Sequence, residues 1–198
     1  MSIFGDLFGG DQIDSALINV LKRWMPTYLR EIVRQRGLEV VLDAPRSYIA
    51  VSDFEHWPEE QLPSVVIVNP GISEGPKKDG AGTYRASWPV QICITVSAPN
   101  EPECRRNAQL YIAAARGCIM GRRSLEAGMK GTDWTSEDYE LIDSDMRRSQ
   151  AGARATFVIE RENVVTVGAG PTDPELDPQP EDWPEVTDTE VSVEKEKL

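Results

Sequence analysis

The sequence TYRASWPVQICITVSAPNEPECRRNAQLYIAAARGCI, residues 83–119, contains the two clearest elements of the chain. From Ala86 to Val96 apolar residues alternate with polar or small ones, and this period of two indicates a half-buried strand. The strand breaks before Asn100, which can cap a helix running from about Pro102 to Arg122. That helix carries an apolar stripe at helical spacing, formed by Ala108, Tyr111, Ile112, Ala115 and Ile119.

Two residues within this stretch predict local detail. Pro89 near the start of the strand indicates a sheet edge or a bulge, because proline cannot donate to a strand ladder. Gly117 and the alanines of the helix predict a close approach of that helix to a sheet.

The segment upstream predicts helical structure from Asp11 to Arg36. Asp11 or Asp14 can cap its start, and Gly37 suits the position just after its end. Pro26 is expected to end or kink the first helix and to begin a second one, because proline lacks the N–H of a helix interior.

Strands are predicted on both sides of the central stretch. Upstream lie Arg46–Ser52 and the β-branched run Ser64–Val68, and downstream lie Trp134–Asp143 and Arg154–Val167. The order helix, helix, strands, helix, strands favours an α+β fold with a mixed, largely antiparallel sheet and helices packed on one face. We expect residues 11–167 to form this domain and residues 1–10 to be an N-terminal extension.

Composition excludes several classes of function. The 198 residues include 21 Lys and Arg against 33 Asp and Glu, a net charge of −12, which argues against a protein that grips nucleic acid phosphates. Residues 1–10 lack the features of a secretory signal, and no stretch is long and apolar enough to predict a membrane span. The three cysteines, Cys93, Cys104 and Cys118, are spaced too widely for a CxxC pair and are expected to be buried or half-buried thiols.

Much of the negative charge lies in residues 168–198, an acidic and proline-rich C-terminal arm. Ten acidic residues against Lys195 and Lys197 give the arm −8, which leaves −4 of the total −12 for residues 1–167. The arm has too few apolar residues to fold alone. The plainer interpretation is a solvated tail; the alternative is that Trp183 and Val186 help to anchor the arm on a neighbouring subunit. On that hypothesis, deletion of residues 170–198 weakens assembly.

Four further residues are candidate partner contacts. Arg30 and Arg34 fall on the outer side of the N-terminal helical region, where they could meet an acidic partner or form a solvated face. Lys77 and Lys78 lie in the glycine-rich segment 71–82, which lacks the spacing of a phosphate-binding loop and is interpreted as a hairpin tip.

No catalytic, metal-binding or cofactor-binding motif is present in a usable context. His56, the only histidine, lies beside acidic residues, but no nucleophile motif or second ligand accompanies it. Acidic residues also gather on a predicted strand and the turn after it, where a charged surface is the plainer interpretation than a Mg²⁺ site; they are Glu137, Asp138, Glu140, Asp143 and Asp145. We therefore expect no catalytic residue, cofactor or metal.

The order of these elements resembles the tail terminator (tail completion, or head–tail joining) family of long-tailed bacteriophages. The residues that carry the resemblance are IDSALINVLKRWMP, PRSYIAV, LPSVVIV, the stretch of residues 83–119 and ARATFVIE, within residues 11–167. The resemblance lies in the order of the elements and in their residue patterns, not in an invariant motif. The acidic C-terminal arm is not part of it.

The resemblance implies a structural virion protein of the neck. Such a protein forms a hexameric ring on the tail tube, ends growth of the tube and joins the tail to the head-side connector. Its partners would be further copies of the chain, the tail tube protein and a head-side stopper, with DNA passing through the lumen without sequence-specific binding. It would be located at the top of the tail in the virion, and in the host cytoplasm during assembly.

Two other functions remain open at this point. The first is a head-side stopper or adaptor, which would also form a ring but would bind the portal side first. The second is a small cytoplasmic enzyme or regulatory domain with a site around His56 or Asp143.

Overall fold

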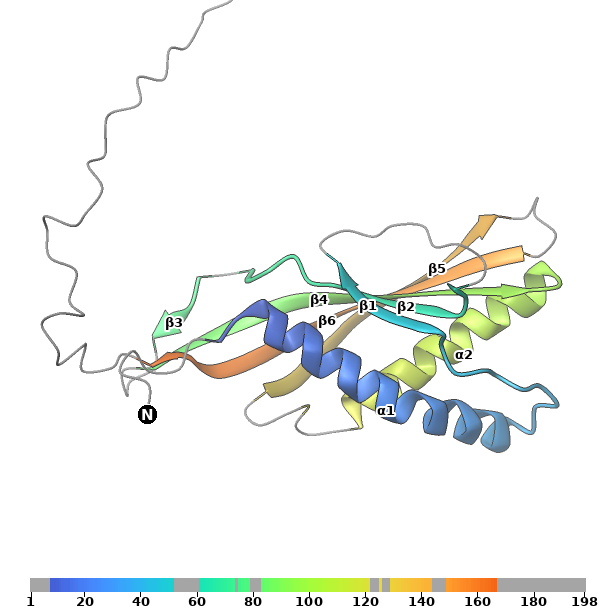
Figure 1. Cartoon of the computed structure of the whole chain (residues 1–198), viewed down its shortest axis with the longest axis horizontal. Coiled ribbons are helices and arrows are strands. Elements are labelled where there is room, and N and C mark those ends of the chain that lie inside the picture. Colours follow the sequence, from blue (N-terminus) through green and yellow to red (C-terminus); the bar gives the residue numbers. More distant parts are fainter. Residues whose placement is uncertain are drawn as a thin grey trace, which may run out of the picture.

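The computed structural model describes residues 8–51, 61–73, 75–78, 83–121, 125, 129–143 and 149–166. Two helices and six strands follow one another along the chain (Figure 1). In chain order they are α1 (Gly10–Arg36), β1 (Ser47–Val51), β2 (Ser64–Val68), β3 (Lys77–Lys78), β4 (Thr83–Ala98), α2 (Glu101–Met120), β5 (Met129–Asp143) and β6 (Ser149–Thr166).

The strands form one sheet in the order β1-β2-β4-β6-β5, and β3 pairs with the start of β4. Only the β1–β2 pair is parallel, whereas β4 is antiparallel to β2, β3 and β6, and β5 is antiparallel to β6. The predicted mixed, largely antiparallel sheet is therefore confirmed. Its two edges differ, because the five-residue β1 lies at one edge and the 15-residue β5 at the other.

Three strands are longer than their sequence patterns predict. β4 and β6 pair from Thr83 with Thr166 to Ala98 with Ser149, and β5 begins at Met129 rather than at Trp134. Cross-strand pairing thus continues through residues without clear alternation, which is why periodicity alone underestimates these strands.

Pro89 lies at a local edge of β4. The strand pairs with β3 at Tyr84 and Arg85 and with β2 from Gln91 to Thr95, so within the described residues Pro89 has a partner strand, β6, on one side only. This position agrees with the predicted edge. A register shift, which marks a bulge or irregularity, occurs earlier, between Tyr84 and Ala86.

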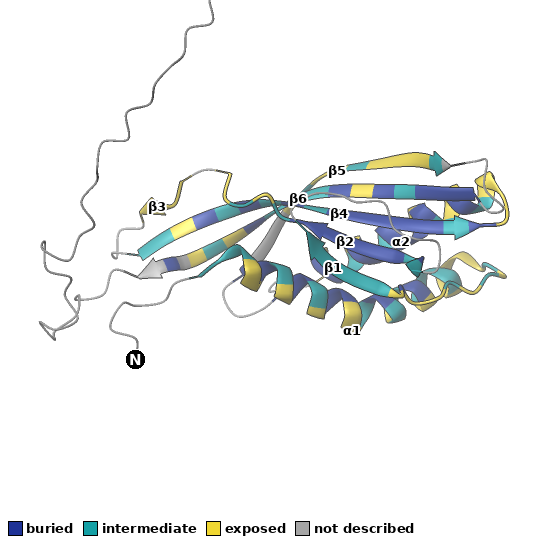
Figure 2. Ribbon diagram, turned by 45° about the horizontal axis from the view of Figure 1, so that its top comes forward, coloured by how far each residue is buried: buried dark blue, intermediate teal, exposed yellow. Residues whose placement is uncertain are grey.

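Both helices cover the same face of the sheet (Figures 1 and 2). α2 contacts β4, β5 and β6, whereas α1 contacts β1, β2 and α2. Neither of these two described helices combines the length and the apolar character that crossing a bilayer requires.

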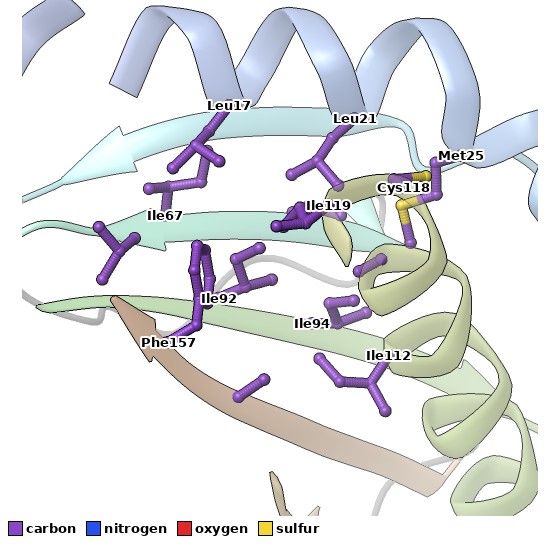
Figure 3. Packing of buried hydrophobic residues seen from close by; sticks show 14 of the residues in the cluster. Leu17, Leu21, Met25, Ile67, Ile92, Ile94, Ile112, Cys118, Ile119 and Phe157 are labelled. Carbon is purple, nitrogen blue, oxygen red and sulfur yellow. The ribbon is translucent and has the colours of Figure 1, made fainter. Parts of the chain in front are cut away.

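The main core lies between the helices and the sheet (Figure 3). Leu17, Leu21 and Met25 of α1 and Ile112, Cys118 and Ile119 of α2 point toward Ile67, Ile92, Ile94 and Phe157 of the sheet. The predicted stripe of α2 is confirmed, since all five of its residues are buried. Complete burial of one such large aliphatic side chain contributes about 1.5–3 kcal/mol. A smaller cluster of Val66, Val68 and Cys93 occupies the opposite face of the sheet.

The ends of the helices follow local chemistry. Asn100 caps α2, because its Oδ1 accepts a hydrogen bond from the Glu103 amide at 3.0 Å. Gly37 ends α1 in the left-handed conformation, with φ 60° and ψ 36°, as predicted. The predicted caps Asp11 and Asp14 are wrong, since both lie inside α1 and Gly9 is its N-cap.

Two further predictions are corrected by the structure. Pro26 neither ends α1 nor starts a second helix, because α1 is one continuous helix of 27 residues. Met25 and Leu29, on either side of the proline, both pack in the core, and this burial holds the helix together through Pro26. Gly117 allows a close approach to Tyr28 of α1, not to the sheet.

All three cysteines are buried thiols outside any disulfide, as predicted. Cys104 lies where three elements meet, and its Sγ–H is within hydrogen-bond distance of the carbonyl oxygens of Val96 and Ser149. It therefore behaves as a small core residue with a weak polar contact.

Candidate interaction surfaces

The second half of α1 carries a basic outer surface, which we call the basic face of α1. It consists of Lys22, Arg23, Arg30, Arg34 and Arg36, all of them exposed. Five basic residues against Glu31 give residues 22–36 a net charge of +4, in a part of the chain (residues 1–167) whose total is −4. The structure thus places the two predicted contact residues of this helix, Arg30 and Arg34, on one solvent-facing surface.

Local contacts orient these arginines. The Arg34 guanidinium donates to both carboxylate oxygens of Glu31, with Nε at 2.9 Å and Nη2 at 2.5 Å, and Gln35 donates to the same carboxylate at 2.7 Å. These hydrogen bonds lower the pKa of Glu31 to about 2 and raise the pKa of Arg34. Arg30 donates from Nε to the Pro26 carbonyl oxygen at 3.3 Å. Both guanidinium groups are therefore held along the helix surface.

An open hollow of about 520 Å³ lies within the basic face of α1. Its walls are Trp24, Thr27, Tyr28, Arg30, Glu31 and Arg34. The Arg23 guanidinium lies 5.3 Å from the centroid of the Trp24 ring, a cation–π arrangement. The basic face thus combines aromatic surface with arginine side chains.

Lys77 and Lys78 lie at the end of the β-ribbon formed by β3, β4 and β6. Both side chains are exposed, and their residues pair with Arg85 and Tyr84 of β4, which confirms the predicted hairpin. In Figure 1 this ribbon extends past the start of α1. A small hollow of about 160 Å³ beside it is lined by acidic as well as basic residues, including Glu160 and Glu162.

Residues just before α1 hold the base of the ribbon. The Phe8 amide donates to the Val164 carbonyl oxygen at 3.0 Å, and the Phe8 ring meets Trp88 edge to face at 5.9 Å. The Arg161 guanidinium lies 4.7 Å from the centroid of the Phe8 ring. The ribbon is therefore tied to the start of α1.

The acidic residues of β5 do not converge on one site. Glu137 faces α2 and accepts from Arg116 at 2.5 Å, from the Trp134 indole N–H at 2.8 Å and from the Tyr139 hydroxyl at 2.6 Å. Burial and the hydrogen bond to Glu137 raise the pKa of Tyr139 to about 12. Asp138 faces the other side of the sheet, in register with Arg154.

Among the described residues no group of three or more potential ligands is placed to hold a metal ion. Of the remaining sequence-predicted candidates, His56, Asp145, Trp183 and Val186 lie outside the described residues, as does the side chain of Asp143.

Sequence reasoning missed a further hollow, of about 510 Å³, beside the first turns of α2. Val41, Glu103, Asn107 and Tyr111 are among its walls, and the Tyr111 hydroxyl donates to the Asp43 carbonyl oxygen at 2.6 Å. Val41 is 90% exposed. The apolar run LEVVL at residues 38–42 was the available signal, because it lies outside both predicted helices and strands.

Among known proteins, similarity to this chain was found in solved structures. A scan against protein-family models found no match, and a search of curated proteins found none. Among solved structures, the chain is similar to one in the "Virion of native gene transfer agent (GTA) particle", with 14% sequence identity and a TM-score of 0.39. The match covers 71% of this chain and 93% of that chain. A likeness of this degree assigns no function, because one fold can serve many functions.

Proposed function

We propose that this chain is a structural virion protein that forms a ring on the end of a phage tail tube, stops tube growth and joins the tail to the head-side connector. The proposal starts from the resemblance of residues 11–167 to tail terminator proteins. It is a proposal of function through shape and contact rather than through a catalytic centre.

The observation that carries the proposal is the asymmetry of the molecule. A ring needs a heterologous interface, in which each subunit offers two different surfaces. The sheet has a short parallel edge at β1 and a long antiparallel edge at β5, and the β-ribbon projects at one end. Unlike edges and unlike ends supply the two different surfaces that head-to-tail contact requires.

The β-ribbon is the proposed contact with the tube or the connector. Lys77 and Lys78 are exposed at its end, where they can meet an acidic partner surface. The net charge of −12 suits a channel that DNA must pass without sticking, because like charges repel.

The first test is the mass of the purified chain by light scattering on a sizing column, with negative-stain imaging of the peak. The same measurement is repeated with purified tail tubes. We expect a hexameric ring, alone or on the ends of tubes. A monomer that ignores tube ends would overturn the proposal.

Headless tails distinguish a terminator from a head-side stopper or adaptor. A terminator is already present on a purified tail that lacks a head, whereas a stopper that binds the portal side first is absent from it. His56→Ala tests the enzyme hypothesis, because our proposal expects assembly to be unchanged by this substitution.

A further inference from the structure

We propose that the acidic C-terminal arm of one copy, residues 168–198, binds the basic face of α1 on a neighbouring copy, with Trp183 at the hollow beside Trp24 and Tyr28. The inference rests on the self-association in the proposed function, but not on binding to a tail tube.

The distribution of charge favours the basic face of α1 as the surface that binds the acidic arm. The arm carries −8, and residues 1–167 carry −4, so most of the chain offers the arm no net attraction. Residues 22–36 carry +4. The basic site at the β-ribbon is partly neutralised, because Glu160 and Glu162 line the hollow beside Lys77.

The apolar parts match as well. Trp183 and Val186 are flanked by Glu181, Asp182 and Glu185, so the arm offers an aromatic ring among carboxylates. The hollow of about 520 Å³ offers two aromatic rings among arginines. Indole burial and arginine–aromatic stacking would add to the ion pairs, each of which is weak when exposed.

The arm is long enough to reach a neighbouring copy. β6 ends at Thr166, which pairs with Thr83 at the end of the β-ribbon and lies near the start of α1, where Phe8 bonds to Val164. Arg30 lies 20 residues beyond Gly10, about 30 Å farther along the helix. Trp183 lies 17 residues beyond Thr166, and an extended chain of that length spans more than about 50 Å, so length alone allows contact with this face on the same copy or on an adjacent one. We assign the contact to an adjacent copy because the proposed ring brings a second copy within this reach.

Photo-crosslinking of the full chain tests this contact. Trp183 is replaced by p-benzoylphenylalanine, and unlabelled subunits are mixed with ¹⁵N-labelled ones before illumination. We expect mass spectrometry to find cross-links to residues 22–34, with light–heavy pairs among them at the share that random mixing of the subunits gives. Cross-links elsewhere, or cross-links without light–heavy pairs, would overturn the inference.

Charge reversal provides the matched comparison. Arg30→Glu with Arg34→Glu should reduce the yield of these cross-links about tenfold, which corresponds to about 1.4 kcal/mol. Lys77→Glu with Lys78→Glu changes the net charge equally and should leave the yield unchanged. Glu181→Lys with Glu185→Lys in the arm should restore it in the Arg30/Arg34 variant. Equal loss in both charge variants would show a general charge effect and would contradict the inference.

The two proposals fail in distinguishable ways. Intersubunit cross-links to residues 22–34 without capping of tube ends would remove the terminator function and keep the arm contact. Rings that cap tubes but cross-link elsewhere would remove the arm contact alone.

Discussion

Gly117 sets the distance between the two helices. A Cβ at this position would lie 2.7 Å from Cδ1 and 2.8 Å from Cε1 of the Tyr28 ring. The same ring forms one wall of the hollow in the basic face of α1. The absence of one methyl group on α2 therefore determines where an aromatic side chain of α1 can lie.

Gly117→Ala should destabilise the fold by about 2 kcal/mol, because overpacking outweighs the better helix propensity of alanine. Thermal unfolding measures the change. Tyr28→Ala should cost stability by itself but should remove most of the additional cost of Gly117→Ala, as a double-mutant cycle would show. Gly75→Ala is the control, since a Cβ there meets nothing within 4 Å. Equal stability of Gly117→Ala and the wild type would contradict the proposed role of Gly117.

Asp14 is a half-buried carboxyl in α1 with one specific partner. Its Oδ1 accepts from Asn69 Nδ2 at 2.9 Å, and the same Nδ2 donates to the Gly10 carbonyl oxygen at 3.2 Å. Burial raises the pKa of Asp14, and this effect outweighs the hydrogen bond from Asn69, which lowers it. Asp14 thus joins α1 to Asn69, which follows the end of β2, although burial disfavours the charged form of its carboxyl group.

The raised pKa predicts a pH dependence with a definite sign. The folded chain holds the Asp14 proton more tightly than the unfolded chain, so the stability contributed by Asp14 is lost as the pH rises through the folded-state pKa. Asp14→Asn keeps an oxygen that can accept from Asn69 and does not titrate. Its free energy of unfolding, relative to the wild type, should therefore rise between about pH 3 and about pH 7.

Urea unfolding at the two pH values measures this difference. Ser15→Asn, an exposed neighbour that does not titrate, is the control. A relative stability of Asp14→Asn that falls with rising pH would contradict the expected sign.

At the scale of elements, the tertiary contacts of α1 outweigh the local tendency of Pro26 to interrupt the helix. Proline inside a helix removes one hydrogen bond and crowds the preceding turn. Seven residues of α1 are nevertheless buried, from Ile13 to Leu29, and they lie on both sides of Pro26. Burial against the sheet and α2 offsets the local cost, and the basic face of α1 exists as one surface because the helix continues.

Pro26→Ala should stabilise the chain by about 1–2 kcal/mol, since the Lys22 carbonyl oxygen regains an amide partner and alanine favours the helix. The free energy of unfolding in urea measures the gain, and helix content by circular dichroism should change little. A lower stability would show that packing of the proline ring matters more than the missing hydrogen bond.

The edge strand β5 is held by side chains as well as by its ladder. The Glu137 carboxylate joins Arg116 of α2 to Trp134 and Tyr139 of β5, and the Trp134 ring stacks on Phe157 at 5.3 Å. These contacts bind the outer strand to the helix layer. The Glu137 carboxylate, which the sequence placed in an acidic cluster, is therefore already occupied by these hydrogen bonds.

At the scale of the whole molecule, charge is unevenly distributed along the chain. The arm is acidic, the second half of α1 is basic, and the described body has two unlike sheet edges. This distribution suits repeated contacts between copies of the chain.

Deletion of residues 170–198 should weaken assembly, because it removes a net charge of −8 and the apolar contacts of Trp183 and Val186. The measurement is the concentration at which oligomers dissociate, by sedimentation, at low and at high salt. We expect the full chain to lose more affinity with salt than the truncated chain does. Unchanged assembly after truncation would contradict an intersubunit role of the arm.

The sequence by itself determined the elements whose signals are local. The run Ser64–Val68 is β2 within the bounds that its β-branched residues predict, and Asn100 and Gly37 mark helix ends through their own side-chain or backbone chemistry. The exposure of Arg30 and Arg34 also followed from helical spacing. Only the tertiary structure decided the parallel pairing of β1 with β2, the continuity of α1 through Pro26, and the position of Tyr28 against Gly117 that shapes the hollow. These features depend on contacts between residues far apart in the chain, whose free energies outweigh local propensity and leave no periodic trace in the sequence.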